Sequence, residues 1–239
     1  MGSNQRILSI RNKSKYHKRS LVEAVLYIVK TGCQWRMLPH DYPPHDTVWS
    51  FYRRARENGV WDKMMQHLVK ITRKQAGRNE EPSCALIDSQ SVKTTCYGEN
   101  HGYDGEKTKG RKRHIVTDTM GNLLCIHVHA ANIHDTKGGV YTFEKALYRY
   151  PTIQAGCADG GYRGTFRNTF DEFHNIRIDI SMQIKEQKGF QVLPKRWVVE
   201  RTFAWLNGSR RLSKDYETSC CSAETMIIIS HAATLLKRL

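Results

Sequence analysis

The 239-residue sequence contains no long hydrophobic run. Its longest apolar stretch, MIIIS at residues 226–230, is far shorter than the roughly 20 residues that cross a bilayer, and the N-terminal segment has no hydrophobic signal core. The sequence also lacks a C-x-x-C pair, because its seven cysteines are dispersed apart from Cys220 and Cys221. We therefore expect no membrane partner, no zinc site and no disulfide framework, and we expect a reducing, cytoplasmic location.

Acidic residues are scarce relative to basic ones. Lysine and arginine number 38 against 23 acidic residues, which gives a formal net charge of +15 and an isoelectric point near 9.6. Such an excess favours a polyanionic partner. Nucleic acid is favoured over a membrane surface, because the basic residues do not gather on one amphipathic face.

The first third of the chain has helical periodicity. Residues 20–31 place apolar side chains at helical spacing, with Ser20 as the expected cap and Gly32 as the expected stop. Two further helical patterns, at 47–59 and 60–75, follow a proline-rich turn. We predict a helical DNA-binding module over residues 1–75 and a polar linker over residues 76–83.

The periodicity changes after the linker. Five short apolar or alternating segments begin at CALID, HIVTDT, LLCIHVHAA, IQAGCAD and IRIDISMQI, and helical patterns separate or follow them. This order of strand, hairpin, helix, strand, helix, strand and helix is typical of α/β proteins. The prediction is one mixed α/β domain over residues 84–239, with a five-stranded sheet flanked by helices.

Two predicted strands end in an acidic residue. Asp88 closes CALID and Asp159 closes GCAD, and reactive groups in α/β sheets gather at the carboxyl ends of strands. A third acid, Glu200, is the only one in RWVVERTFAWLNGSRRL at 196–212, where helical spacing puts it on a polar stripe between two apolar flanks. If the strands are neighbours, Asp88, Asp159 and Glu200 form a carboxylate cluster suited to two Mg²⁺ ions and phosphodiester chemistry.

Simpler interpretations of these acids remain open. Glu200 has helical spacing for an ion pair with Arg196, and an aspartate after a strand commonly serves in a turn or a helix cap. Asp118 fits a hairpin turn, whereas Asp135 fits either a helix cap or a group facing the site. Tyr162 and Ser89 lie near the acids in sequence but have no evident base to activate them.

Cationic residues surround the predicted acidic cluster. The glycine-bearing segment between the first two strands contains five of them, and others follow Asp88 and Asp159 or lie on the 196–212 helix. Phosphate contact is the functional hypothesis for this set, and a solvated charge run is the alternative. The candidate DNA-binding residues are Lys93, Lys107, Lys109, Arg111, Lys112, Arg113, Arg163, Arg196, Arg201, Asn207, Arg210 and Arg211.

Several blocks carry a family resemblance. LIDSQSVKTT, GYDGEKTKGRKRHIVTDTMGNLL, HAANIHD, ADGGYRG and WVVERTFAWLN resemble, in order and spacing, the bacterial insertion-sequence DDE transposases of the IS-five group. The resemblance implies an RNase H-like core, Mg²⁺ that Mn²⁺ can replace, and Asp88, Asp159 and Glu200 as the metal-binding catalytic triad. It also implies double-stranded DNA partners, namely terminal inverted repeats and target DNA, a homodimer on DNA, and a bacterial, nucleoid-associated location.

The sequence departs from the family pattern at two positions of the last block. Leu193 stands where the family has tyrosine, and Asn207 stands where it has lysine. The favoured function is a transposase that cuts phosphodiesters at element ends and joins the 3′-hydroxyl to target DNA. The alternatives are a structure-specific nuclease of the same fold and a catalytically silent DNA-binding regulator.

Overall fold

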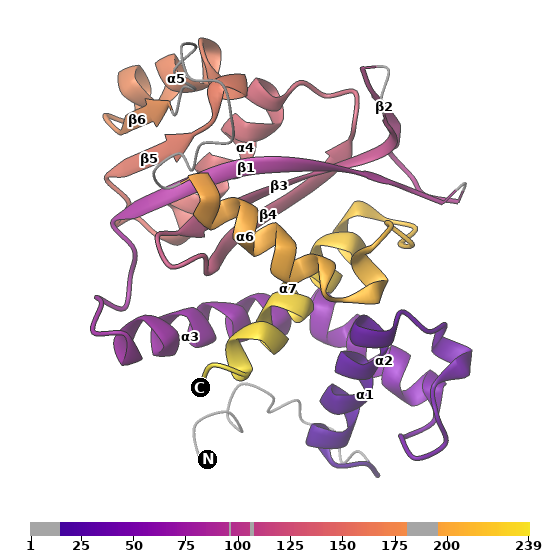
Figure 1. Cartoon of the computed structure of the whole chain (residues 1–239). Coiled ribbons are helices and arrows are strands. Elements are labelled where there is room, and N and C mark those ends of the chain that lie inside the picture. The colour runs from indigo at the N-terminus through magenta and orange to yellow at the C-terminus, as the bar shows by residue number, and fades with distance from the viewer. Residues whose placement is uncertain (1–14, 96, 106–107, 181–195) are drawn as a thin grey trace.

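The computed structural model describes residues 15–95, 97–105, 108–180 and 196–239. In these ranges a mixed sheet packs against helices, and a group of helices lies beyond one end of the sheet (Figure 1). The strands that the structure describes are β1 (Cys84–Lys93), β2 (Gly102–Asp104), β3 (Thr108–Asp118), β4 (Leu123–Ala130), β5 (Ala155–Ala158) and β6 (Arg177–Ile180). The chain is therefore a mixed α/β protein, as the pattern of elements predicts.

The long strand β1 lies at the centre of the sheet. It pairs antiparallel with β3 on one side and parallel with β5 on the other, and β6 extends the parallel side. On its far edge β3 pairs antiparallel with both β2 and β4. The antiparallel strands β3 and β4 are joined by a tight turn in which Gly121 has φ +82°, whereas the parallel crossovers pass through helices.

Helices cover the sheet from opposite sides. Helix α4 (Asp135–Arg149) contacts β1, β3 and β4, and α5 (Thr165–Phe173) packs beside it. Helix α6 (Arg196–Asn207) lies against β1 and β3 on the other side (Figure 1). Burial of both faces of β3 leaves little of that strand in contact with solvent.

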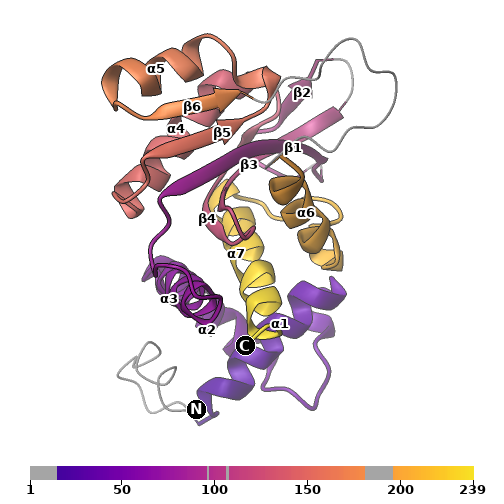
Figure 2. The ribbon, with the colours of Figure 1, turned by 60° about the vertical axis from the view of Figure 1, so that its left-hand side comes forward.

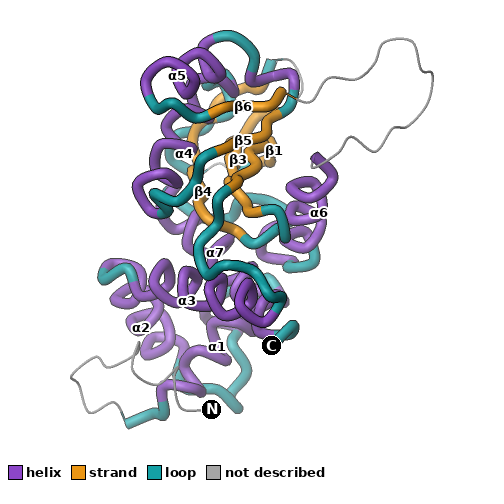
Figure 3. The backbone as a smooth tube through the Cα atoms, turned by 90° about the vertical axis from the view of Figure 1, so that its left-hand side faces the viewer, coloured by secondary structure: helices purple, strands orange, loops and turns teal. Residues whose placement is uncertain are grey.

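The N-terminal helices pack against the C-terminal helix. Helices α1 (Lys18–Thr31), α2 (His45–Glu57) and α3 (Val60–Gln75) and the short η1 (Trp35–Met37) form this group. The C-terminal helix α7 (Cys220–Leu236) contacts β4, α3 and α1, and so runs from the sheet into the group (Figures 2 and 3). Its apolar run is buried on all sides, and no helix in the described part of the chain is long and apolar enough to cross a membrane.

Some boundaries differ from the sequence predictions. Gly32 ends α1 in a left-handed conformation as predicted, but the side chain that caps its start belongs to His17 and not to Ser20. The described residues hold six strands and not five, because part of the expected basic loop forms β2 and extends β3 back to Thr108. The helix predicted over 196–212 ends at Asn207, after which residues 210–212 form a separate 3-10 turn, η3.

Candidate active site

Asp88 and Asp159 lie side by side on neighbouring strands. The parallel register pairs Leu86 with Cys157, and each aspartate follows its paired residue by two positions. Adjacent strands are about 4.8 Å apart, so the backbones of the two aspartates lie close together just past the paired part of β1 and β5. Asp159 directly follows β5, whereas Asp88 does not end its strand as the sequence predicted, because β1 continues to Lys93. Both residues line one small cavity together with Val199 of α6.

Local hydrogen bonds orient the two carboxylates. The backbone N–H of Ser89 donates to Asp88 Oδ1 at 2.7 Å, and that of Gly161 donates to Asp159 Oδ1 at 2.9 Å. Asp159 is also the N-cap of the short η2 (Gly160–Tyr162), so it fills both the cap role and a position at the carboxyl end of β5. These bonds fix the direction in which each carboxylate leaves its strand.

Glu200 lies on α6, which covers the face of the sheet opposite α4. It follows Val199, a cavity-lining residue, and its side chain is exposed on α6. Across the described residues, no group of three or more His, Cys, Asp and Glu side chains is close enough to hold a metal ion. Asp88 and Asp159, which line one cavity together, offer carboxylate oxygens as metal ligands. One or two carboxylates per ion are enough for Mg²⁺, because Mg²⁺ keeps bound waters and binds phosphate oxygens.

Asp135 is a further acid at this site. Its Oδ1 accepts a hydrogen bond from Ser89 Oγ at 2.8 Å and pairs with Lys112 Nζ at 3.0 Å. A Cβ placed on Gly161 would lie 3.1 Å from Asp159 Oδ1 and 3.9 Å from Asp135 Oδ2, which brings the two carboxylates to the same glycine. The cap of α4 is His134, so the site-facing alternative for Asp135 is the one that the structure favours.

A buried aromatic layer lies below the acids. Tyr162 is 1% exposed, and its hydroxyl is 3.0 Å from His114 Nδ1. Burial raises the pKa of Tyr162 well above its usual value, and the charges of Asp88 and Asp135 raise it further. The phenol therefore stays protonated, which excludes Tyr162 as a phenolate nucleophile.

His114 and His129 pack as neutral rings. Their centroids are 4.9 Å apart in a stacked arrangement, and burial lowers the pKa of both imidazoles. A Cβ on Gly138 of α4 would lie 2.3 Å from His129 Nε2 and 2.8 Å from His114 Nε2. The absence of a side chain at Gly138 thus lets α4 approach the sheet closely, against the rings of His114 and His129.

Three predicted phosphate contacts are buried and paired. Arg111, Lys112 and Arg113 are 0%, 4% and 2% exposed, because alternate residues of β3 point to opposite, covered faces. Arg111 pairs with Asp215, and Arg113 Nη1 donates to the carbonyl of Leu212. The expectation that these three contact DNA is corrected, since their side chains are buried and bind internal groups.

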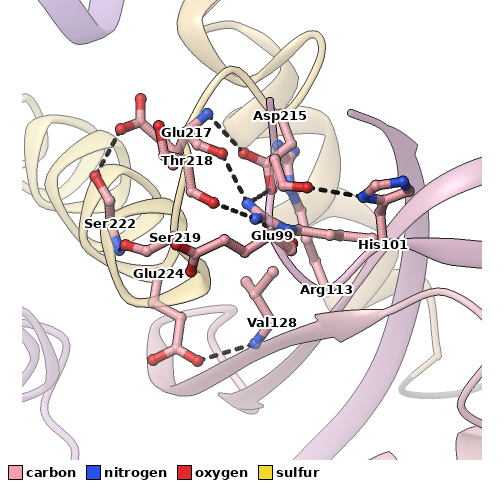
Figure 4. A network of polar contacts seen from close by, with 12 residues as sticks. Glu99, His101, Arg113, Val128, Asp215, Glu217, Thr218, Ser219, Ser222 and Glu224 are labelled. Atoms are coloured by element: carbon pink, nitrogen blue, oxygen red, sulfur yellow. Dashed lines mark hydrogen bonds and ion pairs between the residues drawn. The ribbon is translucent and has the colours of Figure 1, made fainter. Parts of the chain in front are cut away.

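The segment that contacts β3, residues 212–218, is held by hydrogen bonds from the arginines of that strand. Figure 4 shows residues of this polar network, in which Glu217 accepts from Ser222 Oγ at 2.6 Å and Glu224 accepts from Val128 N at 2.9 Å. Arg211 Nη2 pairs with Glu217 at 2.7 Å, so this candidate contact is also engaged inside the protein. Arg201 lies between two tryptophan rings and donates to the carbonyl of Met120.

The other candidate contacts differ in accessibility. Lys107 lies outside the described residues, and for Arg196 only the backbone at the start of α6 is described. Lys109 is exposed and stacks its ammonium over Tyr103 at 5.6 Å from the ring centroid. The remaining candidates, Lys93, Arg163, Asn207 and Arg210, have exposed side chains.

Comparison with known protein families decides the affiliation. A family model described as the transposase DDE domain matches residues 79–235, and one described as a putative transposase of the IS4/5 family matches residues 4–65. The chain belongs to the IS4/5 family of DDE transposases. The resemblance inferred from the sequence blocks is thereby confirmed.

Individual relatives of this IS4/5-family chain are distant. The insertion element IS402 uncharacterized 16.2 kDa protein of Burkholderia cepacia is 29% identical over 86 residues, which are 35% of this chain and 57% of that protein. The chain thus spans just over half the length of this curated relative.

Solved structures with similarity to the chain include two Mos1 transposase complexes. The paired-end complex with the left transposon end shares 12% identity over 71% of this chain and 60% of that one, with a TM-score of 0.28. The Mos1 mariner paired-end complex with Mn shares 10% identity over 96% and 78%, with a TM-score of 0.32. With TM-scores this low, the architecture rests on the chain's own strand order.

The sequence interpretation left one residue open and missed a second set. It allowed Asp135 either a helix cap or a place facing the site, and the contacts with Ser89 and Lys112 separate these two possibilities. The missed set lies in WRMLPHDYPPHDTVWSFYRRAR and lines one hollow together with a segment near the C-terminus; it consists of Trp35, Trp49, Tyr52, Arg53 and Arg56. Their interleaving was the available signal, but the partner loop was not evident.

Proposed function

We propose that this family member is a DNA transposase that hydrolyses phosphodiesters at insertion-sequence ends and joins the freed 3′-hydroxyl to target DNA. The observation that carries the proposal is that Asp88, within β1, and Asp159, directly after β5, line one cavity just past the residues where these parallel strands pair. Membership of the DDE family supports a metal-dependent nuclease or transferase. The strand order β4-β3-β1-β5-β6 supports the RNase H-like core implied by the sequence blocks.

In this proposal three carboxylates divide between two faces of the site. Asp88 and Asp159 provide oxygen ligands from the sheet, and Glu200 provides one from α6. Bound Mg²⁺ ions would activate the attacking oxygen and stabilise the leaving one. Asp135, held by Ser89 and Lys112, would fix the shape of the site from α4.

The remaining exposed cations would hold the DNA. The guanidinium of Arg163 lies beside Gly160, next to Asp159, so it would contact a phosphate placed at the acids. Lys93 is exposed five residues further along β1 than Asp88 and would contact the DNA at a greater distance from the acids. Arg210 and Asn207 extend this surface beyond the end of α6. We propose that the N-terminal helices contribute to element-end binding and that the protein acts as a dimer that joins two ends.

Replacement of one carboxylate tests the chemistry. Asp88→Asn keeps the size of the side chain but removes a metal-binding charge, so Mg²⁺-dependent cleavage and joining of end DNA should fall by at least about 100-fold. Binding of the same DNA, measured by fluorescence anisotropy, should change little. Asp179→Asn, an exposed acid on β6, is the matched control and should keep full activity.

The assay also separates the alternatives. Joining at the wild-type rate by Asp88→Asn would refute the assignment of the site. Cleavage without joining by the wild-type protein would favour a nuclease, and DNA binding without either reaction, with and without added Mg²⁺, would favour a regulator.

A further inference from the structure

A second site lies away from the acids, between α2 and the segment that joins η3 to α7. It is an open hollow of about 350 Å³. Sites for small molecules measure roughly 300 to 1,000 Å³, so a single nucleotide has room here and a DNA duplex does not. Nothing in the proposed reaction at Asp88 and Asp159 uses this hollow.

Aromatic rings form much of its wall. Trp35 and Tyr52 lie with ring centroids 5.2 Å apart, and Tyr52 is fixed by its hydroxyl at 3.0 Å from Ser222 Oγ. Trp49 and Tyr216 also line the hollow and remain 42% and 45% exposed. Large exposed rings on a fixed framework offer flat faces on which a planar ligand can stack.

The hollow also carries net positive charge. Its acid, Glu217, is paired with Arg211 at 2.7 Å and accepts a hydrogen bond from Ser222. Two further guanidinium groups, of Arg53 and Arg56, line the wall, and the nearest acid to Arg53 is Glu57 at 4.0 Å. Each of these arginines lies over an aromatic ring, at 5.1 Å and 5.8 Å from the centroids.

We propose that this hollow binds one unpaired nucleotide of the DNA substrate. The base stacks on Trp49 and Tyr216, and the adjoining phosphate binds Arg53 and Arg56. Stacking on aromatic rings together with arginine contacts is how proteins hold single strands without sequence preference. The proposal rests on the proposed function, because it takes DNA to be the substrate.

The unpaired state follows from the geometry of the ligand. In a duplex both faces of a base are covered by its neighbours, and only the edges are open in the grooves. A base must leave the stack before its face can meet an aromatic ring. The hollow should therefore distinguish a single strand, or a strand end with an unpaired base, from a blunt duplex.

Binding measurements with two DNA probes test the inference. The probes are a fluorescent oligothymidylate single strand and a blunt duplex of an element end, and affinity is measured by anisotropy. Trp49→Ala should weaken binding of the single strand by roughly 5- to 150-fold and leave the duplex nearly unaffected. Trp49→Phe, which keeps a ring, should retain most of the affinity.

Matched controls separate the site from general charge and aromatic content. Arg56→Gln should weaken the single strand more than Arg54→Gln, since Arg54 is exposed on the same helix but does not line the hollow. Tyr148→Ala removes a tyrosine that is 90% exposed on α4 and should change nothing. Melting curves of all variants show whether each one is folded.

Several outcomes would overturn the inference. These are a wild-type protein that does not bind the single strand, and single-strand affinity in folded Trp49→Ala that equals that of the wild type. If such a variant instead changed from dimer to monomer, the hollow would belong to a protein contact and the inference would be wrong. In each case duplex binding and Asp88-dependent cleavage by the same preparation would leave the proposed function intact.

Discussion

Replacement of Arg111 by methionine should destabilise the protein far more than it weakens DNA binding. The guanidinium of Arg111 is 0% exposed, and Nη1 contacts both Asp215 Oδ2 at 3.2 Å and the carbonyl of Glu217 at 2.9 Å. Its Nε donates to the carbonyl of Glu99, and Nη2 donates to that of Thr218. Methionine would leave the buried Asp215 carboxylate without this partner.

The expected loss of unfolding free energy follows from leaving the buried Asp215 carboxylate without its arginine partner. Removing one partner of a buried ion pair costs about 3 to 5 kcal/mol of unfolding free energy. Because the N–H of Glu217 still donates to Asp215 at 3.0 Å, we expect the lower end, about 3 kcal/mol. For a chain of this size that corresponds to a fall in Tm of roughly 6 to 12 °C.

Urea and thermal unfolding followed by circular dichroism measure this loss. Lys109→Met, an exposed residue two positions earlier on β3, is the control and should stay within about 0.5 kcal/mol of wild type. At a temperature where both variants are folded, Arg111→Met should bind DNA like the wild type. A stable Arg111→Met protein with weakened DNA binding would refute the structural role and restore the phosphate contact.

Two further predictions concern buried rings. Tyr162→Phe should keep DNA cleavage within a few-fold of wild type, because the protonated phenol is not a nucleophile. The variant should lose about 1 kcal/mol of unfolding free energy, because the contact between the Tyr162 hydroxyl and His114 is removed. A cleavage rate reduced 100-fold would contradict this. Burial lowers the pKa of His231 from 6.5 to about 3, and its Nε2 accepts from Leu123 N, so the folded state resists protonation. Its contribution to stability is complete above pH 6.5 and is lost as pH falls towards 3, by up to about 1.4 kcal/mol per pH unit; His231→Gln should flatten that slope in denaturation measured across this range, and an unchanged slope would refute it.

Local sequence patterns predicted most elements of the fold. The positions of β1, β4, β5, α1 and α3 follow from apolar periodicity and from residues that end helices, such as Gly32. The strand β2 and the start of β3 were missed, because glycine and lysine in that segment have low strand propensity. From Gly110 onward β3 pairs with β1, which provides a partner edge up to Lys93, and residues 108–110 of β3 pair with β2, so pairing outweighs local preference.

The acidic site was predicted in part for a similar reason. An acid after a short apolar run is a local pattern, although only Asp159 ends its strand and β1 continues past Asp88 to Lys93. The parallel pairing of β1 with β5 follows from the α/β order. Asp135 was ambiguous, since only the tertiary contacts with Ser89 and Lys112 separate a cap from a site residue. Glu200 is placed on α6 beside the cavity, and its role as the third ligand stays a proposal.

The sequence by itself determined the family and the mixed α/β class, because these depend on local order. It also singled out Asp88 and Asp159, whose catalytic role stays a proposal. The tertiary structure decided which cations face outward. Arg111 is held by Asp215, which lies 104 positions away, and no local pattern reveals a partner at that separation. The basic run at residues 111–113 is therefore buried in β3, whereas Arg53 and Arg56 of α2 line the open wall of a separate hollow.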